Sequence, residues 1–199
     1  WLEVTESVEC LKGTVGTNDH SADLMEVTHV LSGAMLMLGK KAATIEEGIT
    51  LSKEAVANGK AYQKFVELVK VQGGNVSAIE NLQRYPLPLH TLEVKADADG
   101  SIVEIDALEL GLTAIMLGAG RETLRDAIDH KAGIVLRKKV GDPVEMGDTV
   151  AVLHTDREHA LEPARKRAAH AFVVSHKKPE KEKLILNILS KDGVEPWAE

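Results

Sequence analysis

Apolar residues in the first 75 positions recur at helical spacing. Val4, Val8 and Leu11 are three or four residues apart, and this spacing places them on one face of a helix. Three further segments show the same period, and glycine follows most of these runs. The pattern predicts four helices: from Glu3 to Lys12, from Ser21 to Gly39, from Thr44 to Asn58, and from there to Gly73.

Two of these predicted helices carry more detail. Thr44 with Glu47 three residues later forms a capping box, and Ser21 is suited to cap the second helix. The second helix is apolar around much of its circumference, so we expect it to be buried among other elements. Met35 and Met37 are interpreted as packing residues within it.

The helical pattern fades between Asn75 and Leu89, where Pro86 and Pro88 indicate a linker into β structure. Alternation at Leu92 and Val94 predicts a strand, and Asp99-Gly100 is a typical hairpin turn. Asp106, with Glu109 three residues on, is expected to begin another helix. Gly118-Ala119-Gly120 is expected to end that helix rather than to bind phosphate, since a helix C-terminus presents carbonyl groups.

The stretch from Ala98 to His154 limits the fold most strongly. Strands are predicted at Ser101–Ile105, Gly133–Val140 and Val150–Leu153, with two Gly-Asp turns, at 141–142 and 147–148, before the last. Paired Gly-Asp turns of this spacing are typical of the hammerhead in biotinyl or lipoyl barrel-sandwich domains. Those carriers have a lysine shortly downstream, whereas residues 153–157 here read Leu-His-Thr-Asp-Arg. The fold is therefore expected without an attached cofactor.

The remainder is predicted to be helical at Glu158–Ala171, followed by a charged tail. In the tail, Leu184, Ile185, Ile188 and Leu189 are interpreted as one or two amphipathic helical turns. The helical first part and the β-rich second part together predict an α+β protein.

Composition narrows the classes of function. The 199 residues are 44% hydrophobic, 28% charged and 3% aromatic, with a net charge of −7, which argues against nucleic-acid binding. No apolar run approaches a membrane span, and the first residues do not show the charged-then-apolar pattern expected of a signal sequence. Cys10 is the only cysteine and is expected to be buried. Because the sequence begins at Trp1 without Met, we expect it to be a processed or truncated piece of a longer protein.

No pattern of reacting groups emerges from the chain. The eight histidines are scattered without zinc-site spacing, and no nucleophile elbow is present. His130-Lys131 and the basic run Arg165–Arg167 are interpreted as solvated surface. Taken alone, these residues indicate a structural scaffold without catalytic chemistry.

Several runs closely resemble the C-terminal region of pyrimidine nucleoside phosphorylases and thymidine phosphorylases. The similar runs are Gly100–Ile105, Asp106–Gly111, Leu117–Thr123, Ala132–Leu136, Lys138–Asp142 and Gly147-Asp148. Upstream, Leu2–Val4, Leu11–Gly13, Asp23–Glu26 and Gly39–Ala42 fit the same family's large α/β lobe. The resemblance implies two parts. Residues 1–85 would be the mostly helical end of a large α/β lobe, and residues 86–199 would be the family's C-terminal domain with a barrel-sandwich, hammerhead-like fold.

The resemblance implies that the intact protein is a pentosyltransferase. Such enzymes catalyse reversible phosphorolysis of thymidine or uridine to the free base and a pentose 1-phosphate. The family's Gly-rich phosphate motif and its base-binding residues do not occur here, so this chain alone is expected to be inactive, with no catalytic or substrate-binding residue of its own. Two alternatives remain open: a biotinyl- or lipoyl-like carrier or binding module, and a relative acting on nucleoside monophosphates.

The resemblance also implies a potassium ion, held in the family by main-chain carbonyls and a glutamate that corresponds to Glu6. A hard cation needs several oxygen ligands, and the carbonyl donors would precede Trp1. No organic cofactor, nucleic acid or membrane is implied. The intact enzyme is expected to be a cytoplasmic homodimer, and this chain a monomer.

Overall fold

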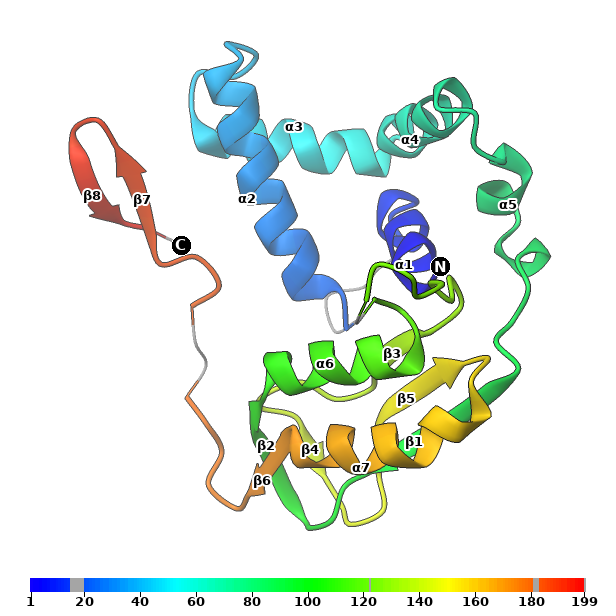
Figure 1. The fold of residues 1–199 in the computed structure, drawn as a ribbon. Coiled ribbons are helices and arrows are strands. Elements are labelled where there is room, and N and C mark those ends of the chain that lie inside the picture. The colour runs from blue at the N-terminus through cyan, green and yellow to red at the C-terminus, as the bar shows by residue number, and fades with distance from the viewer. Residues whose placement is uncertain (15–19, 122, 181–182, 199) are drawn as a thin grey trace. The chain divides into compact units, whose positions relative to one another are not determined.

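The computed structural model describes residues 1–14, 20–121, 123–180 and 183–198 (Figure 1). The chain forms two compact units, and each is built from separate stretches of sequence. The first consists of Trp1–Val8 and Leu68–Glu180, and the second of Glu9–Glu67 and Lys181–Glu199. These units are defined by contacts within the chain, and the domain boundary at residues 85/86 stays a prediction.

The four helices predicted for the first 75 residues are all present. They are α1 (Leu2–Leu11), α2 (Ala22–Leu38), α3 (Ile45–Ala57) and α4 (Lys60–Val71). The predicted N-cap of α3 is confirmed, since Thr44 Oγ1 accepts a hydrogen bond from Glu47 N at 3.2 Å, but the return bond of Glu47 goes to the residue before the N-cap. Glu47 Oε2 accepts this bond from Ala43 N at 2.6 Å. Ser21 occupies the N-cap position of α2 but makes no side-chain cap hydrogen bond, so that part of the prediction is wrong.

Helices α2 and α3 cross at two glycines, Gly33 and Gly48. A Cβ placed on Gly48 would lie 2.4 Å from Gly33 O, and one on Gly33 would lie 2.6 Å from Ile45 O. Only glycine permits this approach. His29 Nδ1 and Ser52 Oγ, 2.9 Å apart, add a hydrogen bond between the helices.

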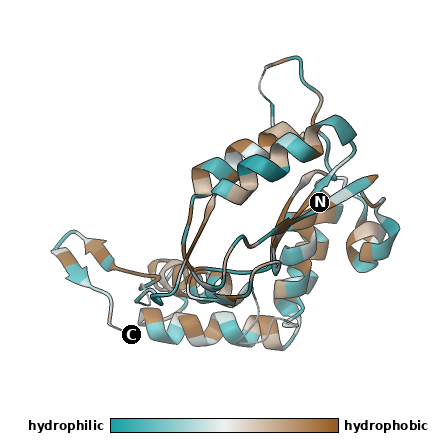
Figure 2. Cartoon of the chain, turned by 90° about the horizontal axis from the view of Figure 1, so that it is seen from below, coloured by the Kyte–Doolittle hydropathy of each residue, from teal (hydrophilic) through white to brown (hydrophobic). Residues whose placement is uncertain are grey.

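The expectation that α2 is buried among other elements is wrong, because several of its large apolar residues are exposed. Met35, interpreted as a packing residue, is 72% exposed. The apolar pattern is present as predicted, but α3 covers only one side of the helix. Figure 2 shows hydrophobic positions along the helices as well as along the strands.

The predicted linker contains two short helical segments, α5 (Val76–Glu80) and the 3-10 helix η1 (Leu82–Arg84). Asn75 and Asn81 cap them, each accepting a backbone hydrogen bond from the residue two positions later at 3.1 Å. Periodicity could not reveal segments of five and three residues.

Two three-stranded antiparallel sheets form the first unit. One has the order β1 (His90–Lys95), β5 (Thr149–Thr155), β3 (Gly133–Leu136), and the other the order β4 (Pro143–Val144), β2 (Gly100–Ile105), β6 (Phe172–Ser175). The predicted hairpin at Asp99-Gly100 is therefore wrong, because β1 and β2 belong to different sheets. Asp99 instead bonds to a residue distant in sequence: its Oδ1 accepts a hydrogen bond from Met146 N at 2.6 Å.

The strands predicted in the 98–154 stretch are present with changed bounds. Strand β3 stops at Leu136 rather than at Val140, because the chain turns there toward the first Gly-Asp pair. Strand β5 is longer than predicted, since Thr149 and Thr155 both continue the pairing with β1.

Two longer helices, α6 (Ala107–Leu117) and α7 (Leu161–His170), pack with these strands, and a 3-10 turn, η2 (Glu158–Ala160), precedes α7. The N-cap of α6 is as predicted: Asp106 Oδ1 accepts Glu109 N at 3.0 Å. Arg167 of α7 forms an ion pair with Glu109 of α6, with Nε and Oε2 2.7 Å apart. The helix predicted at Glu158–Ala171 is confirmed, with a 3-10 turn as its first three residues and an end at His170.

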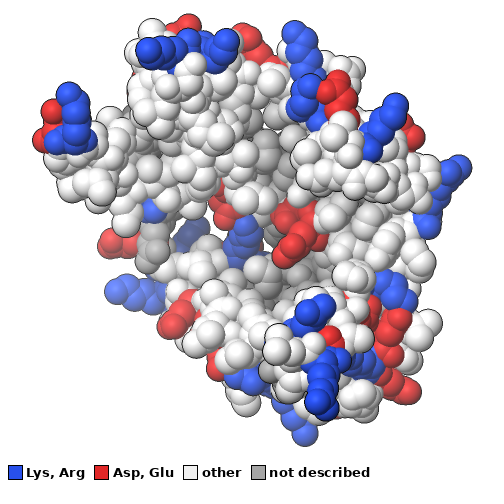
Figure 3. Space-filling model, turned by 45° about the horizontal axis from the view of Figure 1, so that its top comes forward, with Lys and Arg blue, Asp and Glu red and all other residues white. Residues whose placement is uncertain are grey.

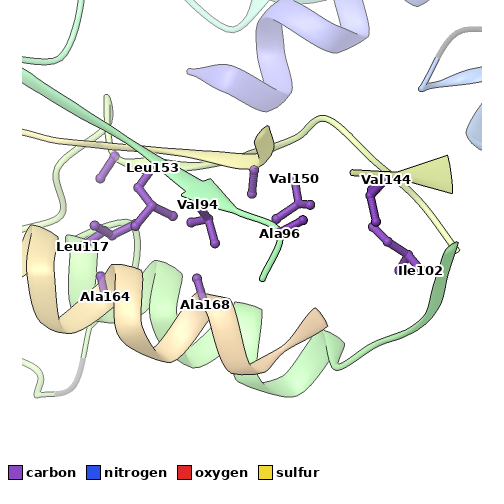
Figure 4. Close-up of a cluster of buried hydrophobic side chains, with 11 residues drawn as sticks. Val94, Ala96, Ile102, Leu117, Val144, Val150, Leu153, Ala164 and Ala168 are labelled. Carbon is purple, nitrogen blue, oxygen red and sulfur yellow. The ribbon is translucent and has the colours of Figure 1, made fainter. Parts of the chain in front are cut away.

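The core of the first unit is aliphatic (Figure 4). Alanines on α7 lie against it, and their small side chains allow the helix to approach closely. Its buried members include Val94, Ile102, Leu117, Val144, Val150, Leu153, Ala164 and Ala168.

The charged tail forms a hairpin, β7 (Asn187–Ser190) and β8 (Gly193–Pro196), so the amphipathic helical turns predicted there are wrong. Ser190 pairs with Gly193, and the two-residue loop Lys191-Asp192 closes the hairpin. Gly193, which follows the loop, has φ of +129°, and it is the turn signal that the helical interpretation overlooked.

The mixed helices and antiparallel strands confirm the α+β class. In the part of the chain that the structure describes, no helix has both the length and the apolar character needed to cross a bilayer.

Candidate functional site

The two Gly-Asp turns make matching contacts, one with Ile102 of β2 and the other with Ala96, the residue that follows β1. Gly141 N donates to Ile102 O at 2.8 Å, and Ile102 N donates to Asp142 O at 3.0 Å. Gly147 N donates to Ala96 O at 2.9 Å, and Ala96 N donates to Asp148 O at 2.8 Å. Both glycines have φ of +94°, which a residue with a side chain rarely adopts. Each turn therefore makes the same pair of backbone hydrogen bonds, one turn with β2 and the other with the residue after β1.

The aspartates of these turns are engaged in the turns themselves. Asp142 Oδ2 accepts Lys139 N at 2.7 Å, and Asp148 Oδ2 accepts Glu145 N at 3.2 Å. This is the turn-capping role that the sequence predicted for them. Both carboxylates thus stabilise their own turns.

Polar side chains gather where β5 ends, and they form a closed network. Asp129 accepts backbone hydrogen bonds from Lys131 at 2.9 Å and from Asp156 at 2.8 Å. Asp156 accepts Leu89 N at 2.8 Å and forms an ion pair with Lys131 Nζ. Hydrogen bonding from Lys131 and then from Leu89 N lowers the pKa of Asp156, and the same pair raises the pKa of Lys131. Lys131 is thus an ion-pair partner, contrary to the solvated loop expected at 130–131.

The segment after β5 is also tied down. The buried Thr155 hydroxyl donates to Leu117 O at 2.6 Å and accepts Arg157 N at 2.9 Å. The Arg157 guanidinium donates to Ala127 O at 2.8 Å. In carrier domains the corresponding segment presents a lysine to solvent, whereas here its side chains bind the body of the unit. This geometry supports the structural use predicted for residues 153–157.

Two hollows flank Arg157. The larger, about 710 Å³, has a partly apolar wall from α6 together with Arg125 and His159. The smaller, about 480 Å³, lies beside Asp129, Lys131 and Asp156. A ligand could bind in either hollow through its apolar wall and cationic groups.

An aromatic pair adjoins the smaller hollow. Tyr85, which lines it, stacks on Trp1 with ring centroids 3.9 Å apart and an interplanar angle of 14°. The backbone nitrogen of Trp1, not the indole nitrogen, donates a hydrogen bond to His130 O at 2.8 Å. The sequence carried no signal for this pair, since its members lie far apart in the chain and neither belongs to a periodic pattern.

His154 is unusual among the polar side chains of the first unit. Both of its ring nitrogens are buried without a hydrogen-bond partner. It lies opposite Gly133 of β3, where a Cβ would come 2.9 Å from Leu2 Cδ1. Burial, and then the charge of Arg137, lowers the pKa of His154.

The predicted metal residue Glu6 lies in α1 and is half-buried. Within the described ranges, no cluster of three or more His, Cys, Asp or Glu residues could hold a metal ion. A potassium site built mainly from carbonyl oxygens would not depend on such a cluster, so the assignment of Glu6 stays a prediction.

The charged surface shows no patch of one sign on the face in Figure 3, where acidic and basic side chains are interspersed. Arg165 pairs with Glu162, and Arg167 with Glu109. The basic run of α7 is thus largely neutralised by its neighbours. Cys10 is buried, as expected.

Comparison with known proteins identifies this arrangement. Residues 101–175, which span β2 to β6, match the family described as the pyrimidine nucleoside phosphorylase C-terminal domain. The class that this match defines is an α+β domain of the kind found at the C-terminus of pyrimidine nucleoside phosphorylases. More particularly, the chain carries a C-terminal portion of the pyrimidine nucleoside phosphorylase family, as the resemblance implied.

Curated relatives extend the similarity beyond that domain. The chain is 40% identical over 161 residues to a pyrimidine-nucleoside phosphorylase of Bacillus subtilis, covering 81% of this chain and 36% of the relative. It is 38% identical over 165 residues to the Staphylococcus haemolyticus protein of the same name, covering 83% and 37%. For a Staphylococcus aureus protein the identity is 35% over 175 residues, covering 88% and 39%. The chain thus spans little more than a third of these relatives' length.

Proposed function

We propose that this chain forms part of an enzyme that cleaves pyrimidine nucleosides reversibly with phosphate, giving the free base and a pentose 1-phosphate, with thymidine and uridine as substrates. The family match over residues 101–175 is the observation that carries this proposal. The similarity over 81–88% of the chain to proteins named pyrimidine-nucleoside phosphorylases supports it.

Within that enzyme, the role proposed for this chain is structural. Phosphorolysis requires a phosphate cradle, groups that bind the base carbonyls, and exclusion of water. The best-formed polar groups described here, the Gly-Asp turns and the Asp129–Lys131–Asp156 network, are occupied by internal hydrogen bonds. A domain of this kind supports an active site whose reacting groups lie in other parts of the protein.

The finer fold proposed for residues 86–199 is a barrel-sandwich with a hammerhead turn. The equivalent contacts of Gly141-Asp142 with Ile102 and of Gly147-Asp148 with Ala96 support it, because a barrel-sandwich uses such paired turns to bring its two sheets together. The intact enzyme is further proposed to be a cytoplasmic homodimer with a potassium ion at Glu6.

A phosphorolysis assay tests the proposal in two arms. The purified chain, given thymidine or uridine with phosphate, is expected to release no thymine or uracil above background. A hybrid in which this chain replaces the matching 161 residues of the Bacillus subtilis relative is expected to release base. Activity of the chain alone would overturn the structural role, and an inactive but folded hybrid would contradict the assignment to this enzyme.

A further inference from the structure

The larger of the two hollows beside Arg157 is formed by residues of the first unit. Its volume of about 710 Å³ lies within the range of pockets that hold small organic molecules. The end of α6, the loop between α6 and β3, and the start of α7 supply its wall, which is apolar at Ile115, Met116, Ala160 and Pro163. We call this pocket the α6–α7 hollow.

Three basic side chains line the α6–α7 hollow, and most of their hydrogen-bond donors are available. Arg157 uses one of the five N–H donors of its guanidinium, Nη2, on Ala127 O at 2.8 Å. Within the residues that the structure describes, the side chains of Arg125 and His159 make no hydrogen bond or ion pair, and both are exposed. The hollow therefore offers positive charge and unused N–H groups to a ligand.

The position of Arg157 is fixed by its surroundings. Its guanidinium lies against Gly118, where an added Cβ would come 2.9 Å from Arg157 Nε. Its backbone N–H donates to Thr155 Oγ1 at 2.9 Å. A guanidinium held in this way loses little conformational freedom when it binds an anion.

The acidic side chain in the described lining of the hollow is already bonded elsewhere. Asp126 Oδ2 accepts a hydrogen bond from Thr123 N, and Asp126 Oδ1 accepts one from Thr123 Oγ1, both at 2.8 Å. This carboxylate is therefore engaged in its own turn, whereas Arg125, the residue before it, keeps its guanidinium free of protein acceptors.

The helix ends at the hollow also permit an anion. The carbonyl groups that end α6 are bonded within the fold, because Leu117 O accepts the Thr155 hydroxyl at 2.6 Å and Gly118 O accepts Asp129 N at 2.9 Å. At the start of α7, the N-cap Ala160 has no side chain that could cap the helix. The positive end of the α7 dipole thus adds to the charge of the arginines.

The charge and shape of the hollow favour one class of ligand. Two guanidinium groups, which stay protonated at any physiological pH, match a group with about two negative charges and several acceptor oxygens. A phosphate monoester carries about −1.5 to −2 at neutral pH and presents three such oxygens. A single carboxylate would leave one guanidinium uncompensated. The apolar part of the wall suits the organic portion of the ester.

We propose that the α6–α7 hollow binds a small phosphate monoester. Arg125 and Arg157 hold the phosphate, His159 donates a further hydrogen bond, and the organic portion lies against Ile115 and Met116. This site is additional to the phosphate site of phosphorolysis, which the proposed function places outside this chain, so it does not depend on that function.

Calorimetric titration of the 199-residue chain, at neutral pH and low salt, tests the site with uridine 5′-monophosphate as the probe. Uridine lacks the phosphate and inorganic phosphate lacks the organic portion. Each is expected to bind at least about tenfold more weakly than the monoester. Ribose 5-phosphate shows whether a sugar phosphate suffices: affinity equal to that of the nucleotide would identify the sugar ester as the part recognised.

Arg125→Gln is expected to weaken binding of uridine 5′-monophosphate at least about tenfold and to leave the thermal unfolding unchanged, because its side chain makes no bond in the fold. The matched control is Arg84→Gln, which removes an exposed arginine of the same unit outside the hollow, and a change of less than about twofold is expected. His159→Gln is a second variant, expected to weaken binding about threefold.

Four results would overturn the proposal. These are no binding of the monoester at millimolar concentration, equal affinity for the monoester and uridine, equal affinity for the monoester and inorganic phosphate, and equal losses in Arg125→Gln and Arg84→Gln. The second would show that phosphate is not recognised, and the third that the apolar wall is not used. The last would show attraction by net charge without a site. If Arg125→Gln unfolds, unchanged binding in His159→Gln would overturn the proposal instead.

Discussion

The Gly-Asp turns and the α2–α3 crossing both depend on glycine, but they use different properties of that residue. Gly141 and Gly147 use a positive φ, and their backbone N–H groups donate to Ile102 O and Ala96 O. Gly33 and Gly48 use the absence of a side chain, and the close crossing they permit buries only one side of α2. The turns make their hydrogen bonds within the first unit, whereas the crossing leaves large apolar side chains of α2 exposed.

The largest effect is expected in the self-contained region. Leu153→Ala removes a fully buried side chain from the centre of the first unit. Truncation of this kind leaves a cavity, so we expect the free energy of unfolding to fall by about 2–5 kcal/mol. Denaturant unfolding measures it, with Leu189→Ala as the exposed control, for which a change within about 0.5 kcal/mol is expected. A loss under 1 kcal/mol, roughly, for Leu153→Ala would show that this core is not closely packed.

The next effect concerns the crossing of α2 and α3. Gly48→Ala places a methyl group against Gly33 O, and the helices must separate to accept it. Overpacking of this kind is expected to cost about 1–3 kcal/mol. The matched control is Gly111→Ala in α6, where nothing lies within 4 Å of the added Cβ. That change is expected to stabilise the protein by about 0.5–1 kcal/mol, because alanine favours a helix.

Thermal unfolding of the two glycine variants makes the comparison direct. Opposite shifts in Tm are expected, downward for Gly48→Ala and upward for Gly111→Ala. An upward shift in both variants would mean that helix propensity, and not the crossing, decides the effect of Gly48.

These differences explain how much of the fold the sequence could predict. Helices were found wherever several turns share a period, as in α1 to α4, and wherever a side chain caps its own helix, as with Thr44 and Asp106. Pairing between strands was not found, because Asp99-Gly100 looks the same whether it closes a hairpin or passes from one sheet to another. Burial of α2 was overpredicted, since periodicity shows that a face is apolar without showing whether a partner covers it.

In the candidate site, too, only contacts between residues close in sequence could be predicted. The turn role of Asp142 and Asp148 was predicted, because each bonds to a backbone group three residues away. The Lys131–Asp156 ion pair and the Trp1–Tyr85 stack were not, because their partners are distant in sequence and are brought together only by the folded sheets.

A smaller effect is expected at the helix caps, and it should be similar in both regions. Thr44→Ala in the second unit and Asp106→Ala in the first each remove the acceptor for a backbone N–H at the start of a helix. Each is expected to cost about 1 kcal/mol in denaturant unfolding. Thr44→Ser and Asp106→Asn retain an acceptor and should recover most of the loss. Failure of these replacements to do so would assign the effect to something other than capping.

The smallest effect distinguishes the two regions by pH. His154 in the first unit and His29 in the second both have a pKa lowered chiefly by burial, with a further contribution from Arg137 and Lys53, respectively. In each case the unfolded chain binds a proton more readily than the folded one. The folded state is therefore expected to lose stability as the pH falls below the ordinary histidine pKa of about 6.5, and to change little above it.

The two histidines differ in their partners, and this difference gives the test. His29 bonds Ser52, whereas neither nitrogen of His154 has a partner. Replacing a buried unpartnered imidazole removes no hydrogen bond, so His154→Phe is expected to retain stability at pH 7.5 and to flatten the loss between pH 7 and pH 5. His29→Phe should also flatten that loss but should lower stability at pH 7.5, because it leaves Ser52 without its partner. Unfolding measured across this range checks both, and an unchanged pH slope in His154→Phe would show that His154 already gains a proton in the folded state.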